Sequence, residues 1–224
     1  MSQLYKRSLV LVFLFISVTS LAQKRSDVGF FAGTSYYLGD INPSRQFYSP
    51  SFAIGGLFRQ SLNRREVLRA NLFYGSVKGN DKDFSNLYQQ TRNKSFSASM
   101  IDASLLFEFN FFPLIFQPRK PNLSPYTFAG LGYEIILSSS NNTKSHFSVP
   151  FGTGLKYVVN EKLTMGVEWS FRKTFMDGID GVANPGEEKY QSAINNKDWY
   201  SFAGIFITFR LFDKTGNCPV YQKK

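Results

Sequence analysis

The stretch IDASLLFEFNF, residues Ile101 to Phe111, alternates between apolar and polar side chains. Every odd position in it is apolar, whereas the even positions include Asp102, Glu108 and Asn110. Successive side chains of a β-strand point to opposite faces, so the stretch is predicted to be a strand with one apolar and one ionisable face. A helical period does not fit it. The segment from Leu163 to Phe171 repeats the same pattern.

Six further segments alternate in a similar way, which gives eight predicted strands. Eight strands with their connections would use nearly all of the chain after the first two dozen residues. We therefore predict an all-β fold, an eight-stranded antiparallel transmembrane β-barrel, over residues 23–213. The predicted strands are Val28 to Gly39, Ser51 to Leu62, Glu66 to Lys78, Ser95 to Phe112, Ser124 to Leu137, Phe147 to Val159, Lys162 to Phe175 and Asp198 to Phe212.

The predicted connections alternate in length. Asn63 to Arg65 and Asn160 to Glu161 are tight turns, whereas long polar loops follow the first, third, fifth and seventh strands. Bacterial membrane barrels keep short turns on the periplasmic side and long loops outside. Pro113 to Leu123 is a longer, proline-containing connection that falls on the periplasmic side.

The first residues resemble an export signal. Lys6 and Arg7 precede the apolar run from Leu9 to Ile16, and small residues suited to a signal peptidase follow at Ser20 and Ala22. These features predict a secretory signal peptide over residues 1–22. The mature chain is accordingly expected in the outer membrane.

A water-soluble barrel of the lipocalin type would also alternate, but with its polar face outward and its apolar face inward. The sequence favours the membrane barrel, because its polar face combines glycines with opposite charges that would neutralise one another in a narrow lumen. The residues expected to form these lumen ion pairs are Arg59, Arg69, Asp102, Glu108, Glu134, Lys156, Glu168, Arg172 and Arg210.

The same residues predict a plugged lumen in place of an open pore. Glycines at positions 130, 132, 152, 154 and 204 are expected to leave room for the long arginines. A structural core of ion pairs is the preferred interpretation of the carboxylates, and a catalytic acid and base pair is the alternative. The aromatic residues expected at the membrane interfaces are Tyr36, Tyr37, Tyr74, Tyr133, Tyr157, Trp169 and Trp199.

The formal net charge of +10 is unevenly distributed over this topology. Basic residues gather on the predicted periplasmic side, where Arg64, Arg65, Arg119 and Lys120 lie on connections between strands. Such a rim would bind an acidic protein partner or lipid phosphates. Export of the chain argues against nucleic acid as a partner.

The last segment, residues 214–224, is predicted to be a periplasmic tail, and it contains the only cysteine, Cys218, followed by Pro219. In an oxidising compartment a lone thiol stays free, binds a soft ligand or bridges to another chain. The tail is therefore a second predicted partner-binding segment.

The sequence has no Walker loop, dinucleotide fingerprint or metal-spaced cluster of cysteine and histidine. We predict a non-enzyme with no cofactor and no metal. The single histidine, His146, stands near Ser145 and Ser148, so a lipid-modifying barrel enzyme is an alternative.

Several short motifs occur in a fixed order along the chain. They are YLGDI at 37–41, SPY at 124–126 with GLG at 130–132, PFGTGLKY at 150–157, EW at 168–169 with RKTF at 172–175, NKDWY at 196–200, and CP at 218–219. Together they resemble the PorG-like outer-membrane barrel family of the Bacteroidota type nine secretion system. The resemblance spans nearly all of the mature chain, and Met176 to Asp180 departs from the acidic and aromatic loop of that family.

The resemblance implies a non-enzymatic outer-membrane barrel that anchors or organises a periplasmic ring assembly of a protein secretion and gliding machine. The implied partners are the ring lipoprotein and ring subunit of that machine, together with outer membrane lipids. The basic turns and the cysteine-containing tail would make the contacts. The alternative is a small adhesin-like surface barrel whose outer loops bind external ligands.

Overall fold

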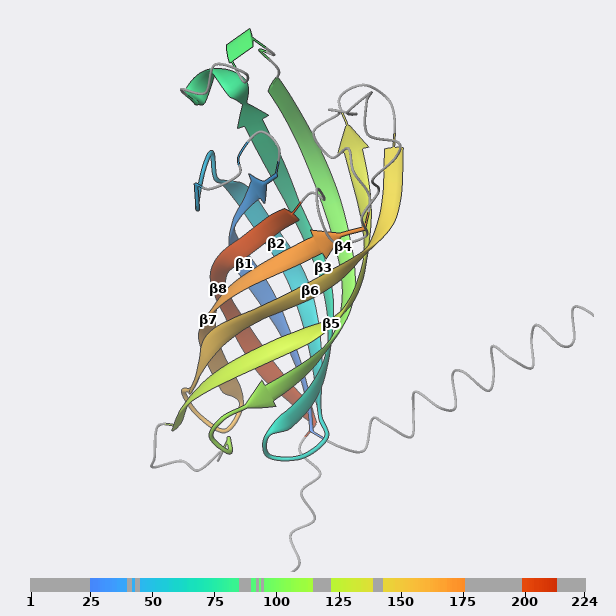
Figure 1. Cartoon of the computed structure of the whole chain (residues 1–224). Coiled ribbons are helices and arrows are strands. Elements are labelled where there is room, and N and C mark those ends of the chain that lie inside the picture. The colour runs from blue at the N-terminus through green and yellow to red at the C-terminus, as the bar shows by residue number, and fades with distance from the viewer. Residues whose placement is uncertain are drawn as a thin grey trace, which may run out of the picture.

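The computed structural model describes residues 25–39, 42, 45–84, 90, 91, 93, 95–114, 122–138, 143–175 and 199–212. Eight antiparallel strands close into a barrel in chain order, with β1 paired to both β2 and β8 (Figure 1). The predicted eight-stranded antiparallel barrel is confirmed. The strands are β1 (Ser26–Leu38), β2 (Ser51–Ser61), β3 (Glu66–Asn80), β4 (Ser95–Asn110), β5 (Asn122–Ser138), β6 (Thr143–Val158), β7 (Leu163–Thr174) and β8 (Trp199–Phe212).

Some of the predicted features lie outside the described residues. These are the signal peptide at residues 1–22, the basic pair Arg119 and Lys120, and the tail with Cys218 and Pro219. In the part of the chain that is described, no helix is long and apolar enough to cross a membrane.

The observed strand bounds agree with the predicted bounds to within four residues. The largest difference is at β6, which begins at Thr143 and not at Phe147. Residues before Ser148 in β6 pair with β5 alone, and residues after Gly75 in β3 pair with β4 alone. The four strands β3 to β6 therefore rise beyond the other four at the long-loop end (Figure 1). On the inner face of that extension Val77, Ala98 and Ile136 are buried, whereas the outward Lys78 is exposed, so the polarity of the two faces is reversed there.

The outer wall of the barrel is apolar and its lumen is charged. On β4, Leu105 and Phe107 are 54% and 46% exposed on the outside, whereas Asp102 and Glu108 on the opposite face are fully buried. On β5, Leu131 is 70% exposed. A soluble protein rarely exposes such a continuous apolar surface, so this wall faces hydrocarbon and the lipocalin alternative is wrong.

Two of the expected interface aromatics lie elsewhere. Tyr37 points into the lumen and joins its buried core. Tyr36 is also buried, because Phe47 of the β1–β2 connection packs on its ring with centroids 4.9 Å apart. The hydroxyl of Tyr36 donates to Gln46 Oε1 (2.8 Å) and accepts from Trp169 Nε1 (2.8 Å). The first loop thus folds onto the outside of the barrel, a contact that strand periodicity does not contain.

Replacing Leu105 with arginine tests whether the apolar outer wall of the barrel faces hydrocarbon. Leu105 lies near the middle of the apolar band on β4, so a buried guanidinium there should lower the free energy of unfolding in lipid vesicles by about 2–4 kcal/mol. The measurement is the urea midpoint followed by tryptophan fluorescence. Ser95→Arg is the matched control, because Ser95 is an exposed residue of the same face of β4 beyond the band. Equal midpoints for the two variants would mean that the wall does not face hydrocarbon.

Candidate functional site

Glu108 of β4 is the centre of the larger ionic cluster in the lumen. Its Oε1 accepts from Arg59 Nε (3.2 Å) and Arg69 Nη1 (3.1 Å), and its Oε2 accepts from Lys156 Nζ (2.5 Å). The three cations come from β2, β3 and β6, so a single carboxylate ties strands from opposite parts of the barrel. Lys156 Nζ also donates to Asn110 Oδ1 (3.0 Å).

Glu168 of β7 completes this cluster. Arg69 donates to it with both terminal nitrogens, Nη1 to Oε2 (2.5 Å) and Nη2 to Oε1 (3.2 Å). The Tyr126 hydroxyl adds a further bond to Oε2 (2.7 Å). Two-pronged contacts of this kind fix both the position and the plane of the guanidinium, so Arg69 is held across the full width of the lumen.

A second ionic cluster lies nearer the long-loop end, around Asp102. Its Oδ2 accepts from Arg172 Nε (3.4 Å) and from the Tyr200 hydroxyl (2.9 Å), and its Oδ1 accepts from Ser104 (3.0 Å). Arg172 Nη1 in turn donates to Ser170. Glu134 of β5 is fully buried opposite Asp102 in the β4–β5 register.

Near the tight-turn end, Arg210 pairs with Asp27 at 3.5 Å from Nε to Oδ1. The β1–β8 register sets Asp27, which was not among the residues expected in the lumen, opposite Arg210. Among the described lumen residues, five basic side chains therefore face five acidic ones. These are Arg59, Arg69, Lys156, Arg172 and Arg210 against Asp27, Asp102, Glu108, Glu134 and Glu168.

Aromatic rings separate the two larger clusters. The guanidinium carbons of Arg69 and Arg172 lie 5.9 Å and 5.7 Å from the centroid of the Phe73 ring. Phe73 also stacks on Phe31, with ring centroids 4.5 Å apart. Lys156 lies 4.1 Å from the centroid of Tyr126. Cations beside aromatic faces gain electrostatic stabilisation that increases away from water.

Three of the five glycines expected in the lumen lie against these rings and not against arginines, whereas Gly130 meets the backbone of β4 and Gly132 meets the Ser148 hydroxyl. A Cβ at Gly154 would lie 2.6 Å from the Tyr126 ring, and one at Gly152 would lie 2.7 Å from Phe128. A Cβ at Gly204 would lie 2.8 Å from the Phe31 ring and closer still to the backbone of Ala32 and Gly33. The expectation from the sequence was therefore wrong in its detail, because the aromatic rings take the space and the cations pack against them.

The lumen is closed to water at the level of these clusters. Arg69, Arg172, Asp102, Glu108 and Glu134 are all fully buried. A water-filled channel would expose charged side chains on its wall. These buried clusters form a structural core. Their carboxylates are inaccessible to a substrate, which argues against the catalytic interpretation.

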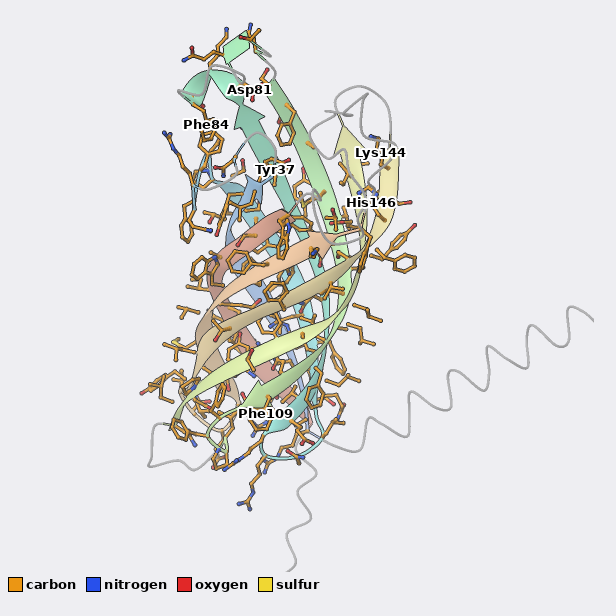
Figure 2. The ribbon with its side chains drawn as sticks, in the orientation of Figure 1. Tyr37, Asp81, Phe84, Phe109, Lys144 and His146 are labelled. Atoms are coloured by element: carbon orange, nitrogen blue, oxygen red, sulfur yellow. The ribbon has the colours of Figure 1, made fainter. Side chains whose placement is uncertain are left out.

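His146 and its serine neighbours do not form a surface site. The predicted strand began at Phe147, which left His146 in the preceding loop. In the structure His146 is buried within β6, opposite Glu134 in the β5–β6 register. Figure 2 shows it in the upper part of that strand. Ser148 is buried beside Gly132, while Ser145 is exposed. Among the described residues, no group of three acidic, histidine or cysteine side chains is placed to hold a metal ion.

At the long-loop end, the β1–β2 loop and the β3–β4 loop contact each other, and we call these two the joined outer loops. The Tyr48 hydroxyl donates to Asp83 Oδ2 (2.5 Å) and accepts from the Asn80 amide (3.1 Å), and Arg45 lies 4.9 Å from the centroid of Phe84. Partial burial and the bond to Asp83 raise the pKa of Tyr48 to about 12, so its hydroxyl keeps its proton. Phe84 and Asp81 mark this end in Figure 2, with Phe109 at the opposite end of the barrel.

At the tight-turn end, the arginines of the β2–β3 turn are held by their backbones. The carbonyl of Arg65 accepts from the Asn110 amide (2.7 Å), and the carbonyl of Arg64 accepts from the Leu114 amide (3.1 Å). Asn63 Oδ1 caps the turn by accepting from the amides of Arg65 and Glu66 (both 2.8 Å). Both arginine side chains are exposed, and we call Leu62 to Arg65 together with Phe111 to Leu114 the basic platform.

The apolar wall, the neutralised lumen and the short turns at one end define a plugged transmembrane β-barrel. The family model described as a domain of unknown function (DUF6089) matches residues 6–221, and the chain belongs to that family. None of the curated proteins matches the chain in sequence.

The chain is similar to several solved membrane barrels at low sequence identity. Neisserial surface protein A is similar with a TM-score of 0.50 and 12% identity, over 81% of this chain and 95% of that one. The N-terminal β-barrel domain of Pseudomonas aeruginosa OprF gives a TM-score of 0.44 and 15% identity, over 83% and 97%. The attachment invasion locus protein Ail of Yersinia pestis gives 0.44 and 9%, over 84% and 99%. At 12% identity the likeness to Neisserial surface protein A describes the fold alone.

Substituting Glu108 with glutamine should strongly destabilise the barrel. The change leaves Arg59, Arg69 and Lys156 around a neutral group, and breaking a buried ion pair in this way costs roughly 3–5 kcal/mol. The free energy of unfolding in detergent or lipid, taken from urea titration, measures the loss. Glu161→Gln, in the exposed β6–β7 turn, is the control and should change stability by less than about 0.5 kcal/mol. A Glu108→Gln barrel as stable as the control would contradict the assignment of Glu108 as the centre of the cluster.

Proposed function

We propose that this chain is a non-enzymatic outer-membrane barrel that anchors or organises the periplasmic ring assembly of a type nine secretion and gliding machine. The ordered motifs that resemble the PorG-like family support this proposal, and so does the fold, because closed eight-stranded membrane barrels are an outer-membrane architecture. The proposed partners are the ring lipoprotein and ring subunit of that machine.

The observation that carries the proposal is the burial of the lumen charges. A barrel whose centre is crossed by Arg69 and Arg172, both fully buried, offers no route for a substrate. Its work must then be done by its ends or by its wall. The tight-turn end carries exposed cations on a fixed backbone, which suits a docking role.

The basic platform has the composition of a protein-binding surface. Arg64 and Arg65 are exposed beside Phe111 and Phe112, which are 51% and 57% exposed. Arginine and aromatic residues are enriched in the energetically important parts of interfaces. Because main-chain bonds hold the platform before any partner arrives, binding would cost little ordering of the turn.

The remaining proposed contacts lie outside the described residues. Arg119 and Lys120 belong to the connection that continues from the platform, and Cys218 and Pro219 belong to the tail. In this proposal the tail lies on the periplasmic side, and Cys218 is available to bridge to a partner chain.

A second candidate function is supported by the joined outer loops. The contacts of Tyr48 with Asp83 and of Arg45 with Phe84 give the long-loop end a fixed surface, as a small adhesin-like barrel would need. The two candidates use opposite ends of the same barrel, so variants at one end separate them.

Charge reversal on the platform tests the anchor. The double variant Arg64→Glu and Arg65→Glu should reduce co-purification of the ring lipoprotein with the tagged barrel about tenfold, because it replaces two attractive charges with repulsive ones. Secretion of substrates into the medium should fall with it. Immunoblots of affinity-purified outer membranes measure the first effect, and culture supernatants measure the second.

The matched control reverses two exposed lysines at the other end, Lys78→Glu and Lys82→Glu. It should leave both readouts unchanged. Loss of ring association in the lysine variant alone, with the arginine variant unaffected, would contradict the anchor and favour a function of the outer loops.

A further inference from the structure

One buried side chain, Asn110 at the end of β4, connects the basic platform to the ionic cluster around Glu108. Its Nδ2 and its backbone amide both donate to the carbonyl of Arg65 (2.9 and 2.7 Å). Its Oδ1 accepts from Lys156 Nζ (3.0 Å), and that ammonium group is bound to Glu108. Because Asn110 is fully buried and both ends of its amide are bonded, the turn that carries Arg65 is fixed to the ionic core of the barrel.

Side chains of β5 hold the other half of the platform. The Ser124 hydroxyl donates to the carbonyl of Phe112 (2.9 Å) and accepts from the Phe112 amide (3.1 Å). Asn122 Nδ2 donates to the carbonyl of Pro113 (3.1 Å). The platform is thus a fixed backbone from which its exposed side chains extend.

The two exposed cations of the platform, Arg64 and Arg65, form no ion pair within the part of the chain that the structure describes. The adjacent acid, Glu66, accepts instead from Asn63 Nδ2 (2.5 Å). The cluster around Glu108 carries three basic side chains against two acidic ones, so its net charge adds to that of the arginines. A surface of this kind attracts anionic groups.

We propose that the platform binds carboxylates held on the surface of a folded protein, and that Asn110 is the positioning residue that fixes the backbone of the two arginines for them. The proposal rests on the anchor function proposed above and names the chemistry of the partner surface. Carboxylates of a folded protein have fixed positions, so arginines on a preformed turn bind them with little ordering cost. Lipid phosphates are the competing anions. A fluid bilayer, however, rearranges its headgroups around any arrangement of cations and gains nothing from a fixed turn.

The larger ionic cluster offers two variants that are matched in charge. Asn110→Asp keeps an oxygen for Lys156 but replaces the Nδ2 donor with an oxygen that repels the Arg65 carbonyl. Asn71, further along β3 from the turn, is a buried amide whose hydrogen bonds in the described structure go to lumen side chains, among them Arg69 (2.5 Å). Asn71→Asp is therefore the control, because both variants add one negative charge to a cluster with an excess of one positive charge. Heat-modifiable gel mobility verifies that each barrel is folded.

The first measurement is amide hydrogen exchange of the full mature chain in detergent, followed at residues 63–66 and at Leu114. Asn110→Asp should raise exchange there about tenfold, as expected for the loss of one buried hydrogen bond, and Asn71→Asp should leave it unchanged. The second measurement is co-purification of the ring lipoprotein with the tagged barrel, which should fall several-fold in Asn110→Asp alone. Asn110→Ala removes the amide without adding a charge and should repeat both effects.

Equal exchange at the turn in Asn110→Asp and Asn71→Asp would overturn Asn110 as the positioning residue. Faster exchange with undiminished co-purification would overturn the need for a fixed turn, while the anchor stands if reversal of Arg64 and Arg65 removes the lipoprotein. Reversal without effect would contradict the anchor itself and, with it, the protein partner of the platform. Exchange at the wild-type turn that is slower in vesicles containing phosphatidylglycerol than in neutral vesicles would overturn the proposal in favour of lipid headgroups.

Discussion

The structure depends on one constraint, the neutralisation of charge inside a narrow barrel. Taking an ion out of water costs several kcal/mol after relaxation, so each buried charge must meet an opposite charge and hydrogen bonds. The lumen satisfies this with five basic and five acidic side chains, arranged around Glu108, Asp102 and Asp27. Because the partners come from strands far apart in the chain, the register of all eight strands must be correct for the charges to meet. The ion pairs therefore specify the barrel as much as they stabilise it.

Aromatic residues of the lumen also separate and stabilise the buried charges. Phe73 lies between the two larger clusters and contacts an arginine of each, so the like-charged guanidiniums of Arg69 and Arg172 are kept apart by a ring that attracts both. Glycines such as Gly154 and Gly152 leave the space in which Tyr126 and Phe128 lie flat against the wall. Small, aromatic and charged residues thus occupy the lumen in layers.

The sequence predicted the barrel because alternation is a local property that a single strand carries. It also placed the charged residues on one face, since a period of two assigns every second side chain to the same side. It did not predict which cation meets Glu108, or that Asp27 pairs with Arg210, because these contacts depend on register between strands distant in the chain. The burial of Tyr36 was missed because Phe47 belongs to a loop, whose fold has no period, and the position of His146 was missed because that part of β6 pairs with β5 alone.

A lumen built in this way makes the barrel a rigid body. For its two ends to move relative to one another, Arg69 would have to leave Glu108 or Glu168, and separating a buried pair costs roughly 3–5 kcal/mol. Thermal motion therefore leaves the strands in register, and no lumen rearrangement links the joined outer loops to the basic platform. A rigid barrel with no internal path suits a fixed point in the membrane better than a gate. Its wall, long loops and short turns can then engage lipid, exterior and periplasm independently, since nothing in the lumen couples one surface to another.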